Sequence, residues 1–192
     1  MADNQTPKTD NNQLEAKDKI DYLFKVINRF DFYVNSTNTK GSLIIAWNGI
    51  LIGTVLLKSD DILTVFQSKG WAKIIAVVLL VLVGTCNLIS NVFVFSVVFP
   101  FLRPSSKLPT GRIMQNESML FFGSVAAMGS RDYYRKIVDS DVEEILTDLA
   151  DQAATIAQGL EIKMQLIQKS LVIIGLGLIF IFGLLILKVV AT

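Results

Sequence analysis

Residues that could bind a ligand gather between positions 112 and 135. Arginine guanidinium groups in this segment could pair with a phosphate, aromatic rings could stack on a flat molecule, and amide groups could read its polar edge. A glycine beside the aromatic pair would let the backbone approach closely. The candidate ligand-binding residues are Arg112, Asn116, Phe121, Phe122, Gly123, Arg131, Tyr134 and Arg135. The alternative is that the phenylalanines form an apolar core and the arginines face water or phospholipid.

A second set of polar residues lies inside long apolar runs of the sequence. Asn87 and Asn91 are one helical turn apart, Ser90 lies beside them, and Asn48 belongs to the preceding apolar run. Polar groups within a bilayer are costly, so these side chains must face water or a neighbouring helix. Two interpretations stay open: the residues line a pore in an oligomer, or they form hydrogen bonds that hold helices together.

Three stretches without a charged residue, 41–57, 74–102 and 170–187, position both sets of residues. A transmembrane helix needs roughly 20 mostly apolar residues to match a hydrocarbon core of about 30 Å. The sequence therefore predicts an all-α membrane protein with three transmembrane helices and a cytosolic helical segment between the second and the third. Gly49 and Gly53 give the first span a G-x-x-x-G face, for which ordinary packing within the chain is the expected use.

The predicted organisation has five parts: a disordered tail over 1–13, an amphipathic helix over 14–40, a transmembrane hairpin over 41–102, a cytosolic helical sensor segment over 103–169, and a third transmembrane helix over 170–192. The turn of the hairpin is expected from Lys58 to Lys73. Ser140 and Glu143 match a capping box, which predicts that a helix begins there. No proline follows, so this helix is predicted to continue into the third span. Its coiled-coil-like apolar seam is expected to break at Lys163.

Composition excludes several classes of function. The chain has no histidine and a single cysteine, Cys86, inside the second apolar run, so zinc sites, disulfides and Cys/His nucleophile pairs are not expected. No convergent nucleophile and base are visible, which predicts a protein that is not an enzyme and uses no metal or cofactor. The formal net charge is +1 and the basic residues are dispersed, so no nucleic-acid polymer is expected as a partner.

The distribution of lysine and arginine predicts the orientation in the membrane. More of them flank the outer ends of the first two spans than lie in the turn between those spans, which favours a cytoplasmic N-terminus. The N-terminal stretch is polar and has no apolar region of the kind found in cleaved signal peptides. With three spans, Thr192 is then expected outside the cell.

Two blocks of the sequence resemble the transmembrane effectors of bacterial Pycsar anti-phage systems. The first block is YVNSTNTKGSLIIAWNG, with matching residues Tyr33, Asn35, Asn38, Lys40, Ser42, Ala46 and Asn48. The second block runs from Leu120 to Lys163 and matches at LFFGSVAAM, Tyr134, Asp148, Leu149, Gln152 and Lys163. Together with the order of the spans, the resemblance covers roughly residues 20 to 190. Ser124 departs from the pattern, because family members often carry an acidic residue there.

The resemblance implies a multi-pass effector in the bacterial inner (cell) membrane that senses cyclic UMP or cyclic CMP. A partner pyrimidine nucleotide cyclase would make this ligand on infection. The implied response impairs membrane integrity and causes abortive infection, which we expect to proceed through rearrangement of a homo-oligomer in the lipid bilayer. The alternative is a non-enzymatic membrane scaffold or channel subunit with no nucleotide ligand.

Overall fold

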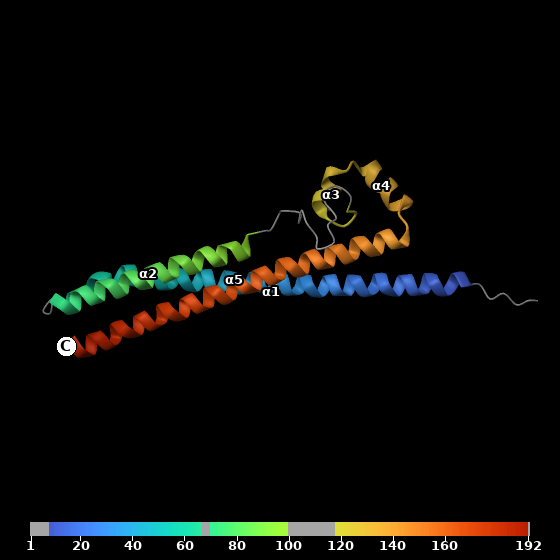
Figure 1. Cartoon of the computed structure of the whole chain (residues 1–192). Helices are drawn as coiled ribbons and strands as arrows, with labels where there is room; N and C mark the ends of the chain where they lie inside the picture. The colour runs from blue at the N-terminus through green and yellow to red at the C-terminus, as the bar shows by residue number, and fades with distance from the viewer. Residues whose placement is uncertain (1–7, 67–69, 100–117, 192) are drawn as a thin grey trace, which may run out of the picture. The chain divides into compact units, whose positions relative to one another are not determined.

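Every regular element of the protein is an α-helix in the computed structural model, which describes residues 8–66, 70–99 and 118–191 (Figure 1). The helices are α1 (Lys8–Val65), α2 (Gly70–Val98), α3 (Phe122–Ala127), α4 (Ser130–Asp139) and α5 (Val142–Ala191). Three of them, α1, α2 and α5, contain a stretch long and apolar enough to cross a membrane. The predicted all-α fold with three spans is therefore confirmed. The last helix also continues into the third span as predicted, because the 50 residues of α5 form one helix.

The described residues form two compact units. The first unit holds α1 up to Val34, then α3, α4 and α5 up to Leu160, while the second holds the rest of α1, α2 and the rest of α5. Within the second unit the three helices lie side by side (Figure 1) and are joined by side-chain hydrogen bonds. Gly41 lets α1 and α2 approach closely, because a Cβ there would lie 3.1 Å from Cγ2 of Val98. Gly49 and Gly53 have nothing within 4 Å of such a Cβ, so the expected packing of this pair within the chain is wrong for the described residues.

The hairpin between the first two spans is tighter than the sequence predicts. α1 continues past the first apolar run to Val65, so most of the expected turn from Lys58 to Lys73 is helical. An ion pair between Lys58 and Asp61, 2.9 Å long, accommodates the charges on the surface of this extension. An apolar cluster then holds this end of the second unit together: Phe66, Ala72, Ala76, Leu184 and Leu187. α2 ends at Val98, as expected from the proline at position 100, which itself lies outside the described residues.

The start of α5 differs from the prediction by one residue. Asp141, not Ser140, caps the helix: its Oδ1 accepts a hydrogen bond from the backbone N–H of Glu144 at 2.7 Å. Ser140 instead ends α4, where its Oγ donates to the carbonyl oxygen of Lys136 at 2.7 Å. Both Ser140 with Glu143 and Asp141 with Glu144 have the spacing of a capping box. The carboxylate of Asp141 is the stronger acceptor and takes the capping position.

The N-terminal boundary and the seam of α5 also differ from expectation. α1 begins at Lys8, within the range predicted to be a disordered tail, while residues 1–7 lie outside the described part. On α5, Lys163 does not break the apolar seam, because it occupies a seam position and is only 6% exposed. The buried residues Leu149, Ala153, Ile167 and Ser170 keep one heptad register on both sides of it. The five-part division of the chain stays a prediction.

Large apolar side chains on the surface of the second unit identify its surroundings. Leu57 is 84% exposed, and Ile179 and Phe182 are each 63% exposed. An exposed apolar surface of this kind is unfavourable in water and suits the hydrocarbon of a bilayer. The helices that carry it are the same three that are long enough to span a membrane.

Candidate functional site

Met119, just before α3, links α4 to α5 within the first unit. Its backbone N–H donates to Oδ2 of Asp148 on α5 at 2.7 Å, and its carbonyl oxygen accepts from the hydroxyl of Tyr133 on α4 at 3.1 Å. Its sulfur lies 3.3 Å from Oγ of Ser140, whose single proton is used in the shorter hydrogen bond to the carbonyl oxygen of Lys136. A hydrogen bond to a carboxylate is among the stronger kinds, so the backbone of one residue ties α4 firmly to α5.

The start of α3 explains two of the predicted ligand residues. Oγ of Ser118 accepts hydrogen bonds from the backbone N–H groups of Leu120 and Phe121, at 3.2 and 2.9 Å, which fixes the turn into the helix. The half-buried ring of Phe121 packs on Phe122, with centroids 4.9 Å apart. A Cβ at Gly123 would lie 2.6 Å from Cε1 of Phe121. A side chain at this position would force the ring of Phe121 to move, so glycine here makes room for an aromatic ring of the same chain.

One face of α4 carries three of the predicted ligand residues. Arg131, Tyr134 and Arg135 are spaced by three and four positions, so they share this face, and all three are exposed. Tyr134 is 69% exposed, and neither guanidinium forms an ion pair with a residue that the structure describes. Two exposed guanidinium groups beside an aromatic ring suit a phosphate attached to a flat base. Tyr133 does not belong to this face, because its hydroxyl is used in the bond to Met119.

The structure says less about the other three predicted ligand residues. Phe122 is 62% exposed in the same unit, whereas Arg112 and Asn116 lie outside the described residues. A groove of about 450 Å³ in the first unit is not formed by any of them; its lining is Glu15, Asp18, Lys19, Tyr22, Leu23 and Leu146. The lysine of that groove is already paired with Glu15 at 2.8 Å, so its charge balance disfavours a phosphate. The grouping of the eight residues into one pocket stays a prediction.

Within the second unit, four polar residues connect all three spanning helices, and we call them the polar cluster. Nδ2 of Asn48 on α1 donates to Oγ of Ser90 and to Oδ1 of Asn91 on α2, each at 3.0 Å. Oγ of Ser90 lies 2.8 Å from Oγ of Ser170 on α5. Asn48, Ser90 and Ser170 are completely buried. The sequence pointed to the first three residues but missed Ser170, for which the available signal was a serine in register with the seam of α5.

Asn87, the fourth predicted polar residue of the spans, is not part of the polar cluster. Its Nδ2 donates to the carbonyl oxygen of Val83 in its own helix at 2.9 Å. Its Oδ1 is buried and has no hydrogen-bond partner among the described residues, as is also true of Oδ1 of Asn48. A buried acceptor without a partner is costly, so both asparagines destabilise this arrangement through their Oδ1 atoms, but Asn48 offsets that cost with hydrogen bonds between helices, whereas Asn87 bonds its own helix.

The buried Lys163 contacts the half-buried Asn38 just outside the apolar runs of α5 and α1. Nζ of Lys163 donates to Oδ1 of Asn38 at 2.7 Å. Burial lowers the pKa of the Lys163 ammonium, since the charged form loses solvent. No carboxylate pairs with this ammonium in the described part of the chain. The sequence comparison drew attention to both residues separately, but their contact across 125 positions of the chain was not predicted.

Three spanning helices with apolar surfaces and a polar cluster between them define a multi-pass α-helical membrane protein. A model of the Pycsar effector protein domain (PycTM) matches residues 22–190. The chain therefore belongs to the PycTM family and has the role of an effector in Pycsar anti-phage defence, as its resemblance to that family predicted. Comparisons with curated proteins and with solved structures return no match.

Proposed function

We propose that this effector senses cyclic UMP or cyclic CMP and, without catalysing a reaction itself, impairs the inner membrane by rearranging a homo-oligomer. A pyrimidine nucleotide cyclase supplies the ligand, and the first unit faces the cytoplasm. The observation that carries the proposal is the hydrogen-bonded path from Tyr133 through Met119 to Asp148. This path ties the helix with the exposed arginines to α5, which continues without a break into the third apolar run.

In the proposed binding mode, Arg131 and Arg135 pair with the phosphate while Tyr134 or Phe122 stacks on the base. Arg112 and Asn116 complete the site from the segment before α3. A ligand changes a population only to the extent that it binds one state more tightly than the other. A shift of α4 on ligand binding would move Met119 and, through its hydrogen bond, Asp148. The ligand's preference for one state of the protein would in this way reach α5.

The membrane step would act on the polar cluster. Its hydrogen bonds hold α1, α2 and α5 together in one state. Separation of the helices would expose Asn48, Asn91 and their serine partners within the bilayer, where polar side chains need water or a new helix as a partner. An oligomer that supplies such water-lined contacts would let ions or small solutes cross.

The ligand is expected to raise the melting temperature of the detergent-purified protein. A ligand that binds only the folded state adds about 2.7 kcal/mol at a concentration of 100 times Kd. The double variant R131Q/R135Q removes both proposed phosphate partners and is expected to abolish the shift. The matched control is K17Q/K25Q, which removes two exposed cations from α1 in the same unit.

Dye release from liposomes completes this test. Cyclic UMP or cyclic CMP is expected to trigger release by the unmodified protein and by K17Q/K25Q but not by R131Q/R135Q. A folded protein that shows no thermal shift at saturating ligand would contradict the proposal. A scaffold without a nucleotide ligand would release no dye with any nucleotide.

Gly49 and Gly53 support the oligomer in this proposal and give a second prediction. A Cβ at either position would meet nothing within 4 Å among the described residues, and this open face of α1 supports a contact with a helix of another chain. The double variant G49I/G53I is expected to lower the yield of cross-linked oligomer in membranes severalfold. G84I on α2 is the control, because a Cβ at Gly84 also meets nothing within 4 Å in the described part of the chain. Equal yields from the two variants would remove α1 from the oligomer interface.

A further inference from the structure

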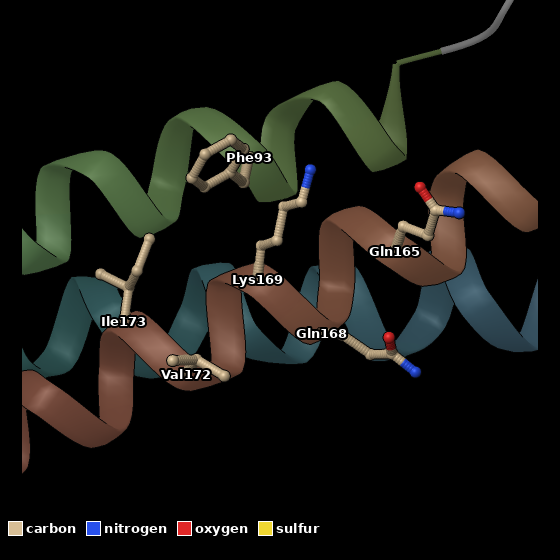
Figure 2. Close-up of a pocket in the computed structure, with 6 residues that line it drawn as sticks. All are labelled: Phe93, Gln165, Gln168, Lys169, Val172 and Ile173. Carbon is tan, nitrogen blue, oxygen red and sulfur yellow. The ribbon is translucent and has the colours of Figure 1, made fainter.

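A groove of about 480 Å³ opens between α2 and α5 at one end of the apolar part of the second unit (Figure 2). It is lined by Phe93, Gln165, Gln168, Lys169, Val172 and Ile173. Lys169 directly precedes the third uncharged run, whereas Phe93 belongs to the second. The groove therefore spans the boundary between the hydrocarbon of a bilayer and its polar headgroups.

The two ends of the groove differ in chemistry. Figure 2 shows the Lys169 side chain extending toward α2 beside Phe93, with Gln165 about one turn of α5 to one side and Ile173 to the other. Lys169 is exposed and forms no ion pair with any residue that the structure describes. An unpaired ammonium and amide groups thus lie at the headgroup level, and aromatic and aliphatic side chains lie deeper.

We propose that this groove binds an anionic phospholipid, with its phosphate at Lys169 and an acyl chain along Phe93, Val172 and Ile173. Basic pockets between transmembrane helices at the headgroup level are suited to such lipids. The deeper part of the groove is apolar, which favours a lipid as the ligand. A soluble anion could contact only the polar end of the groove. The inference is independent of the nucleotide ligand proposed above.

A second groove of the same unit shows why Lys169 is distinctive. That groove, about 400 Å³ in volume, lies between the last turns of α1 and α5 and is lined by Lys58, Asp61, Phe66 and Lys188 among other residues. There Lys58 is paired with Asp61 at 2.9 Å, so its charge is already compensated. Lys169 lacks such a partner among the described residues and is free to bind a lipid phosphate. A lipid seated there contacts both α2 and α5 and favours the state that keeps these helices together.

The test compares lipid retention by native mass spectrometry of the detergent-purified full chain. Phosphatidylglycerol is expected to remain bound in preference to phosphatidylcholine, and K169Q is expected to weaken its binding about fivefold. K73Q is the matched control, since Lys73 is exposed at the other end of α2 and lies outside the groove. K169R is expected to retain the lipid.

Four results would overturn the proposal. Equal retention of the two lipids would remove the need for a charged partner, and equal losses in K169Q and K73Q would mean general attraction to basic residues. Displacement of the lipid by excess inorganic phosphate would assign the groove to a free anion. F93A separates the acyl contact from the phosphate contact: it is expected to weaken phosphatidylglycerol and phosphatidylcholine alike. An unchanged affinity in F93A would contradict the proposed position of the acyl chain.

Discussion

Replacing Asn38 by leucine is expected to lower the free energy of unfolding of the detergent-purified protein by about 2–3 kcal/mol. Oδ1 of Asn38 accepts the hydrogen bond of the Lys163 ammonium at 2.7 Å, and leucine leaves that ammonium buried without this acceptor. Removing one partner of a buried charged contact costs more than the contact itself contributes, because the remaining charge stays desolvated. Denaturant unfolding followed by tryptophan fluorescence measures the loss.

The double variant N38L/K163M is expected to recover most of this loss. Methionine has a length similar to lysine but no charge, so an apolar pair replaces the polar contact. K40M is the control, because Lys40 is exposed and close to Asn38 in the chain. A loss in N38L no larger than that in K40M would contradict the prediction. The prediction would also be contradicted if the loss of unfolding free energy in N38L/K163M equalled the sum of the losses in N38L and in K163M.

The pH dependence of the unfolding free energy tests the same contact, because it depends on the charge of the Lys163 ammonium. Burial holds the pKa of Lys163 below the ordinary value of 10.5. Between the lowered pKa and that value, the unfolded chain binds more protons than the folded one, so stability rises with pH in this interval. The rise is expected to start at lower pH in N38L, since the acceptor that favours the charged ammonium is gone. The rise of stability with pH should be absent from K163M, because methionine does not titrate.

The spans of the fold could be predicted from the sequence because a bilayer imposes a simple requirement. Each crossing needs a long uncharged run, and the three runs found in the sequence lie within α1, α2 and α5. The ends of helices obey weaker rules. Lys58 and Asp61 looked typical of a turn, but at a spacing of three residues they form an ion pair on a helix. The capping-box pattern predicts a cap at Ser140, but Asp141 has the same spacing to an acidic residue, and the structure shows that Asp141 is the cap.

The candidate sites were predictable where one helix defines them and unpredictable where two helices must meet. The shared face of Arg131, Tyr134 and Arg135 follows from their spacing on α4. By contrast, the contact of Lys163 with Asn38 and the bond from Met119 to Asp148 depend on how separate helices align. The sequence marks such residues only as polar groups in unusual positions. It cannot show which of them pair.

Asn48→Leu and Asn87→Leu are expected to change membrane leakage in opposite directions, although both remove an asparagine from an apolar run. Asn48 donates two hydrogen bonds from α1 to α2, and their loss favours separation of the helices at about 0.6 kcal/mol each. N48L also removes the unpaired Oδ1 of Asn48, but it leaves Oδ1 of Asn91 without this donor, so the number of buried acceptors without a partner does not fall. The variant N48L is therefore expected to raise dye release without ligand severalfold. Asn87 bonds only within its own helix, and its Oδ1 has no partner among the described residues.

Leucine at position 87 removes an unsatisfied acceptor whose burial costs about 1–3 kcal/mol. N87L is therefore expected to stabilise the state in which α1, α2 and α5 are held together, and to reduce ligand-triggered dye release about tenfold or more. Its thermal shift with cyclic UMP or cyclic CMP should persist, because the substitution lies outside the first unit. T54V is the control: Thr54 is exposed in the first apolar run and bonds its own helix at Ile50. Reduced release in both asparagine variants would assign both residues to a conducting path, whereas increased release in both would make Asn87 a packing residue. Opposite effects would show that the partner of each amide, rather than its depth in the membrane, decides its role.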